Sequence, residues 1–147
     1  MIILSVKPEF AFAICDRRKT IEFRKTLLAL NETVLLYATS PIKRIVGACV
    51  FTDVERERPA VLRFRFGGPG MVCGPDFADY FKGHFYGFAY EIKYAAPLFE
   101  PANPKDMLGK NWRPPQSWCH IKGLEVHFNS ILNRYCLHKA GSSPAGS

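Results

Sequence analysis

The sequence lacks an apolar run near the ~20 residues that a membrane-spanning helix needs. Residues 1–6 have no basic segment, and Lys7, Pro8 and Glu9 follow at once, so we expect no signal peptide. The five cysteines are an odd number and include no CxxC pair, which argues against a disulfide framework or a zinc site. We therefore expect a cytoplasmic protein with no membrane association, no metal and no cofactor.

Acidic residues are comparatively few: 13 Asp and Glu face 20 Lys and Arg, giving a formal charge of +7. Such an excess favours an anionic partner, namely nucleic acid, a phosphorylated metabolite or an acidic protein, although solubility alone explains it equally well. The length of 147 residues suits one domain, and a content of 48% hydrophobic residues is enough for a buried core. We expect a single domain over residues 1–139, and a flexible tail over residues 140–147.

Hydrophobic periodicity predicts a mixture of strands and short helices without regular βαβ alternation. Strands are expected at 2–6, 20–24, 34–38, 45–54 and 88–94. Helices are expected at 8–16, 75–81 and 124–135, the last amphipathic, with one helical turn at 105–108 inside an otherwise irregular segment 97–118. Residues 59–66 fit either a helix or a strand that ends in the glycine-rich turn 67–70. The order predicts an α+β domain built on a small mixed or antiparallel barrel.

The densest charged stretch is 17–25. Read as a strand, it places Glu22 and Arg24 on one face, about 6–7 Å apart, and Ile21 and Phe23 on the core side. Lys19 can lean over the same face, which makes a cation–anion–cation cluster. Its cations can hold a phosphate, and its carboxylate can accept a base N–H or act as a general base. The pattern alone favours the simpler alternative, a solvated strand with a surface ion pair worth ~0–1 kcal/mol.

The stretch from Val6 to Arg24 resembles the N-terminal signature of the ASCH family in the PUA-like superfamily: a strand, a helix, then G-x-K-x-x-E-x-R. Lys19, Glu22 and Arg24 match its K, E and R. Later stretches that resemble the same family are 37–41 (YATSP), 79–83 (DYFKG) and 115–117 (PQS). The resemblance covers most of residues 1–122.

Arg17 departs from this signature, because it stands where the motif has glycine. Glycine after a helix usually supplies a left-handed residue, and another residue there costs roughly 1 kcal/mol or more. Either the turn has changed shape or Arg17 bears the strain.

The resemblance implies a small PUA-like/ASCH β-barrel with flanking short helices, a C-terminal amphipathic helix and a cleft for RNA or a nucleotide-like ligand. Our leading hypothesis is an RNA-binding module with a role in RNA-linked regulation. In it Lys19 and Arg24 bind phosphate and Glu22 accepts from a base or sugar. The outlying contacts are Lys7, Ser40, Gln116 and Ser117.

The main alternative is an enzyme, either a ribonuclease or a nucleoside amidohydrolase, with Glu22 and Lys19 as catalytic residues. In the family's amidohydrolase branch a threonine replaces the motif's glutamate, and Glu22 lacks that hydroxyl; Thr20 could point the same way. Metal-assisted cleavage would need a further carboxylate such as Glu91. A third alternative is a protein-interaction subunit that uses the aromatic surface. Trp112 and Trp118 could stack on bases, but covering the barrel is the favoured role.

Overall fold

The computed structural model describes residues 1–122, which form one six-stranded mixed sheet in the order β2-β5-β4-β3-β1-β6. β1 and β3 are parallel, and every other neighbouring pair is antiparallel. The strands are β1 (Ile2–Val6), β2 (Ile21–Arg24), β3 (Thr33–Ala38), β4 (Arg44–Glu57), β5 (Gly87–Ala102) and β6 (Trp118–His120).

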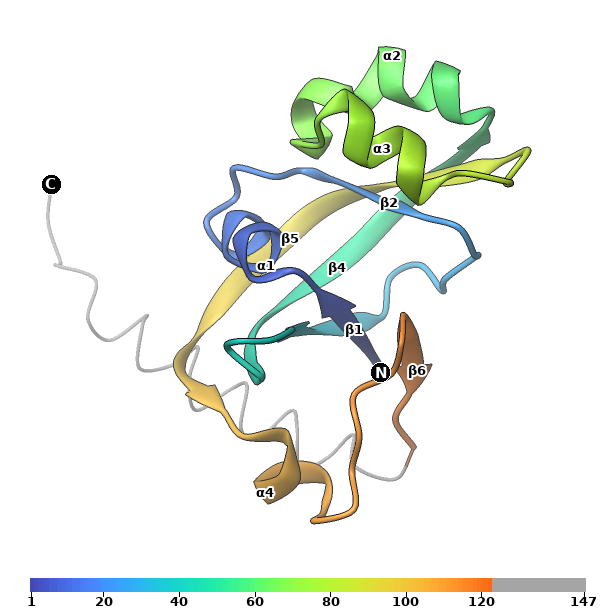
Figure 1. Cartoon of the computed structure of the whole chain (residues 1–147). Helices are drawn as coiled ribbons and strands as arrows, with labels where there is room; N and C mark the ends of the chain where they lie inside the picture. Colours follow the sequence, from blue (N-terminus) through green and yellow to red (C-terminus); the bar gives the residue numbers. More distant parts are fainter. Residues whose placement is uncertain (123–147) are drawn as a thin grey trace, which may run out of the picture.

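The sheet curls into a half-barrel because its two longest strands bend. β4 and β5 have 14 and 16 residues, and their register shifts between Ile45 and Gly47 and again between Val50 and Asp53. Such bulges bend a strand and increase its twist. In Figure 1 both strands run from the end of the molecule near β2 to the end near α4 (Pro104–Leu108). Within residues 1–122, β2 and β6 are the two ends of the sheet, which does not close through strand pairing.

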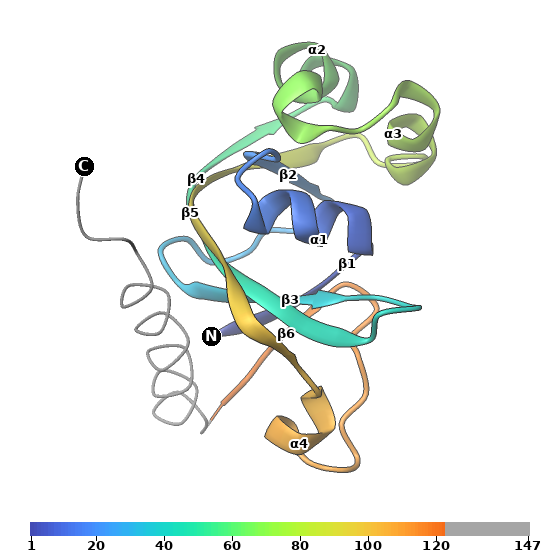
Figure 2. The same cartoon turned by 90° about the vertical axis from the view of Figure 1, so that its left-hand side faces the viewer.

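Helix α1 (Pro8–Cys15) lies in the concave side of this curl, which Figure 2 shows. Its buried residues Ala11 and Ile14 pack with alternate residues of β1, Ile2 and Leu4, in the largest core cluster. The other face of β1, with Ile3, packs in a second cluster near α4. The alternation of β1 therefore fills two cores, which explains why its residues read as one continuous apolar run.

Helices α2 (Pro59–Gly70) and α3 (Gly74–Tyr80) cover the far end of β2 and β5. Segment 59–66, which fitted both states, is helical: Leu62 is fully buried and Phe66 packs beside it, one helical turn later, whereas Phe64 is 91% exposed. The expected turn at 67–70 is wrong, since α2 continues through Gly70. Gly70 allows close packing instead, because a Cβ there would lie 2.2 Å from the Phe23 ring.

The expected irregular segment 97–118 is wrong in part. β5 continues to Ala102, α4 forms near the predicted helical turn, and β6 pairs with β1. Pro97 is tolerated inside β5 because β2 pairs only with residues 88–91, so at Pro97 the strand has β4 on one edge alone. A proline can lack its N–H at such a free edge without losing a ladder hydrogen bond.

Two predictions fall outside the described residues: the amphipathic helix at 124–135 and the tail at 140–147, with the boundary at residue 139. Within residues 1–122, no helix has the length and apolar character to cross a membrane.

Candidate functional site

The turn after α1 sets the position of Lys19. Arg17 adopts a left-handed conformation with φ of 63°, so the turn keeps the shape for which the signature uses glycine. The Arg17 and Arg18 amides donate to the carbonyls of Ile14 and Ala13, and the Lys19 amide also donates to Ala13. This is the Schellman pattern of a helix end. The alternative that Arg17 bears the strain is the one observed.

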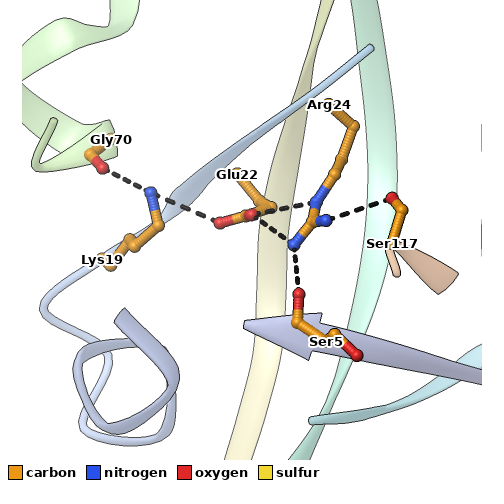
Figure 3. A network of polar contacts seen from close by, with 6 residues as sticks. All are labelled: Ser5, Lys19, Glu22, Arg24, Gly70 and Ser117. Carbon is orange, nitrogen blue, oxygen red and sulfur yellow. Dashed lines mark hydrogen bonds and ion pairs between the residues drawn. The ribbon is translucent and has the colours of Figure 1, made fainter. Parts of the chain in front are cut away.

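Lys19, Glu22 and Arg24 form a buried triad, as Figure 3 shows. The Lys19 ammonium lies 3.4 Å from Glu22 Oε2, while Arg24 Nε donates to Glu22 Oε1 at 3.1 Å. The three residues are only 2%, 6% and 7% exposed. The cation–anion–cation cluster is therefore present, and the alternative of a solvated surface pair is wrong.

Arg24 also ties together parts of the sheet that no strand ladder joins. Its Nη2 donates to the Ser5 carbonyl of β1 at 3.0 Å, and its Nη1 donates to Ser117 Oγ at 3.4 Å. Ser5 in turn holds the segment before β6, through its amide to the Ser117 carbonyl and its hydroxyl to the Pro115 carbonyl. The guanidinium thus bridges the open side of the half-barrel between β2 and β1.

Lys19 is held over the end of α2, where its ammonium donates to the Gly70 carbonyl. The ammonium also lies 5.1 Å from the Phe10 ring centre and 5.7 Å from that of Phe23. Burial removes its water and lowers the pKa of Lys19, an effect that the Glu22 carboxylate partly opposes. Lys19 therefore gives up its proton more easily than an ordinary lysine.

The triad lines a pocket with a volume of about 290 Å³, between β2, α1 and α3. This volume is at the lower end of ligand pockets, about 300–1,000 Å³, and suits a small ligand. Its apolar and aromatic lining residues are Val6, Phe10, Phe23, Val72, Phe77 and Tyr80. The pocket therefore combines aromatic walls with a charged floor.

The predicted outlying contacts divide into three groups. Lys7 and Gln116 line the pocket and are exposed, so both can meet a ligand. Ser117 contacts Arg24 but is not among the lining residues. Ser40 is exposed and does not line the pocket either; its neighbour Thr39 does.

Sequence reasoning missed the pocket residues contributed by α1 and α3. The motif gave no sign of Phe10, Asp76 or Tyr80, because only the tertiary packing of α1 and of α3 brings them to the triad. Predicting 75–81 as a helix did not reveal which of its faces meets β2. An acidic residue in the first turn of that helix, Asp76, was the one available signal.

Glu91 does not join Glu22, so the pair suggested for metal-assisted cleavage is wrong. Glu91 stands opposite Ile21 in the ladder between β2 and β5, while Glu22 stands opposite Tyr90. Directly opposite residues share a face and successive residues alternate, so the two carboxylates lie on opposite faces of the sheet. Within residues 1–122, no cluster of three His, Cys, Asp or Glu side chains could hold a metal ion.

Both tryptophans cover the sheet, as expected. Trp118 packs against the largest core cluster, and its indole N–H donates to Thr26 Oγ1 at 2.9 Å. Trp112 packs against the Tyr37 ring, with centroids 5.3 Å apart.

The chain is similar to proteins from Zymomonas mobilis in sequence and in structure. An ASCH domain-containing ribonuclease is 31% identical over 128 residues, which cover 84% of this chain and 86% of that protein. The crystal structure of ASCH from the same organism is 29% identical, covers 88% of this chain and 94% of its own, and superposes with a TM-score of 0.80. A serine-to-alanine variant of that protein gives a TM-score of 0.81 at 28% identity, over 89% and 94% of the two chains.

The N-terminal domain of McrB from Staphylothermus marinus shares the fold alone, with a TM-score of 0.52 and 12% identity over 90% of this chain and 93% of its own. No family model matches the sequence. The α+β half-barrel with short helices agrees with the ASCH structures, as the sequence resemblance implied. On the identity and coverage of the Zymomonas relative, this chain belongs to the ASCH domain family.

Proposed function

We propose that this protein is an RNA-binding module whose pocket takes one nucleotide of the RNA. The observation that carries the proposal is the buried triad of Lys19, Glu22 and Arg24 on the floor of an aromatic-walled pocket. The relative from Zymomonas mobilis is named a ribonuclease, which makes RNA the ligand to test first.

The pocket walls support a flat base. Sequence-specific RNA recognition stacks unpaired bases on aromatic rings and reads their edges with hydrogen bonds. Phe10 and Tyr80 are half-buried, so their rings keep a surface that a base can cover. A volume of about 290 Å³ suits a single unpaired base better than a base pair.

The charged floor supports recognition of a polar edge. A carboxylate has about four acceptor positions, and Lys19 and Arg24 make three contacts with Glu22. One acceptor position of the Glu22 carboxylate is left for a base N–H or a sugar hydroxyl. The triad carries one more positive than negative charge, and exposed Lys7 adds another cation for the phosphate.

In this proposal Lys19 and Arg24 mainly hold the Glu22 side chain in position through their ion pairs. Their positive charges also attract phosphate at short range. Their donors already serve Gly70, Ser5 and Ser117, so an incoming phosphate would share them. Gln116 is the remaining predicted contact with a free position at the pocket.

A second candidate function is RNA cleavage. The observation that favours it is the contact of Lys19, whose pKa is lowered by burial, with the Glu22 carboxylate inside the pocket. Glu22 would accept the proton of the attacking hydroxyl as that oxygen bonds to phosphorus. The bond from phosphorus to the leaving oxygen would break, the leaving oxygen would take a proton from water, and Lys19 would stabilise the charge that develops on the phosphate. That both groups line the same pocket supports this candidate.

One substitution separates the two candidates. Glu22→Gln keeps the shape and removes the proton acceptor, so an enzyme loses ~10²–10⁴-fold in turnover with little loss of affinity. A binding module has no turnover to lose and keeps its affinity. The measurement is binding and cleavage of labelled single-stranded RNA by wild type and Glu22→Gln, with and without Mg²⁺ or Mn²⁺.

We expect binding of RNA by the wild type and no robust cleavage. Wild-type cleavage that Glu22→Gln abolishes would establish the second candidate in place of the first. Absence of RNA binding at low salt would remove both and favour a protein-interaction role.

A further inference from the structure

A second hollow lies beside the pocket, between the turn that joins β3 to β4 and the segment that runs from α4 to β6. Its volume is about 690 Å³, more than twice that of the pocket. We call it the basic groove. It lies towards the end of the molecule that holds α4, away from α2 and α3 (Figure 1).

Cations dominate this groove. Five of its lining residues are basic and none is acidic; the five are Lys43, Arg44, Lys105, Lys110 and Arg113. No salt bridge within residues 1–122 engages any of them. All except Arg44 are exposed. Five unpaired cations around one hollow create a positive potential that an anionic ligand would neutralise.

The groove also has an aromatic wall and amide groups. Half-buried Trp112 lines it and packs edge-on against the ring of Tyr37. Asn103 and Asn111 add hydrogen-bonding side chains. A positive groove with an aromatic side chain is the chemistry by which proteins track single-stranded nucleic acid.

The groove and the pocket meet along two short segments. Pro114 lines the groove and Gln116 lines the pocket, and two residues span at most about 7 Å. At the end of β3, Tyr37 likewise lines the groove and Thr39, two residues later, lines the pocket. The two hollows are therefore close enough for one RNA strand to reach both.

We infer that the basic groove holds the phosphate backbone of an RNA strand whose single nucleotide occupies the pocket. The inference rests on the proposed RNA binding for the identity of the ligand. The groove supplies affinity through phosphates, and the pocket supplies discrimination through one base, since phosphate contacts carry no sequence information.

The test removes three exposed cations of the groove together: Lys105→Ala, Lys110→Ala and Arg113→Ala. The matched control removes three exposed cations that line neither hollow: Arg56→Ala, Lys82→Ala and Lys93→Ala. Both variants lose the same net charge. A third variant, Tyr80→Ala, removes an aromatic wall of the pocket and leaves the groove intact.

The measurement is affinity as a function of salt, for a mononucleotide and for a single-stranded RNA of about eight nucleotides. That length lies within the ~4–16 nucleotides that single-strand binding sites cover. We expect the groove variant to bind the oligonucleotide about 100-fold more weakly at about 0.1 M salt. Its salt slope should fall by about 2, because each phosphate contact on a single strand contributes about 0.7. Binding of the mononucleotide should be unchanged. Tyr80→Ala should weaken the binding of both.

Three outcomes contradict the proposals in distinguishable ways. Equal affinity of the groove variant and the control variant for the oligonucleotide overturns the groove and leaves the pocket proposal standing. Loss of mononucleotide binding in the groove variant also overturns it, since the groove would then be a site for small phosphates. A weakened groove variant beside an unchanged Tyr80→Ala would support the groove and remove the pocket. Circular dichroism of each variant checks folding, and Lys105→Glu with Lys110→Glu should lower affinity further.

Discussion

Among single residues, Lys19 has the most costly environment in the site. The residue is 2% exposed, and burial of a charge is unfavourable unless partners replace the lost water. Glu22, the Gly70 carbonyl and two aromatic rings supply that replacement in part. The lowered pKa of Lys19 shows that they do not replace it completely.

This lowered pKa predicts a pH dependence of stability. Folded Lys19 releases its proton below the ordinary lysine value of 10.5, so between those two pKa values the unfolded chain binds more protons. Stability of the wild type relative to Lys19→Met should therefore rise with pH up to about 10.5, and stay level well below the folded pKa. Denaturant midpoints of both proteins at neutral pH and at about pH 10 measure this difference. A difference that is constant over the range would contradict the lowered pKa.

Arg17 gives a second prediction at this scale. Its φ of 63° strains any residue except glycine, by about 1 kcal/mol or more. Arg17→Gly should relieve that strain, while Arg17→Ala keeps it and only removes the hydrogen bond from Arg17 Nε to the Ala95 carbonyl. We expect the glycine variant to exceed the alanine variant in free energy of unfolding by about 1 kcal/mol. Equal stability of the two variants in urea would mean that the turn is unstrained.

Among the elements, the end of α2 controls the position of the triad. Gly70 packs directly on the Phe23 ring of β2 and offers its carbonyl to Lys19. The close approach is possible only because Gly70 lacks a side chain. The helix end thus packs against Phe23, which lines the pocket, and is a hydrogen-bond partner for Lys19.

Two glycines of α2 provide a matched pair of substitutions. Gly70→Ala would place a Cβ 2.2 Å from the Phe23 ring, so the helix end must move away from Lys19. We expect a loss of about 1–3 kcal/mol in unfolding free energy, as overpacking usually costs, and weaker RNA binding. Gly68→Ala meets nothing within 4 Å and should be neutral or stabilising. Thermal or urea unfolding of both variants is the measurement, and similar effects of the two would contradict the role given to Gly70.

Sequence patterns predicted the strands well where one face or both faces are buried. The alternation from Phe88 to Tyr94 and the apolar run of β3 both gave strands at the expected positions. The patterns failed where tertiary contacts override local rules. Pro97 continues a strand because its edge is free, and residues 67–70 continue a helix whose last residue, Gly70, packs on Phe23.

Across the whole molecule, the pocket was only half predictable. Residues 19–24 are neighbours in sequence, so spacing alone brought Lys19, Glu22 and Arg24 together. Phe10 and Tyr80 approach that triad through packing of helices far apart in the chain, which no local pattern encodes. The basic groove is similar, since its five cations come from two segments far apart in the chain, 43–44 and 105–113.

The bridge that Arg24 makes between β2 and β1 has a consequence for how the molecule opens. The ladders between the other neighbouring strands consist of many backbone hydrogen bonds, whereas this side relies on one guanidinium and two contacts. The least protected amides of the sheet should therefore lie along Ser5 and residues 117–120, where opening breaks the fewest bonds. A ligand that binds Arg24 would stabilise this side if the guanidinium keeps its hydrogen bond to the Ser5 carbonyl. It would favour opening of this side if the guanidinium gives up that bond. We therefore expect occupancy of the pocket to change the hydrogen exchange of β6, which does not line it.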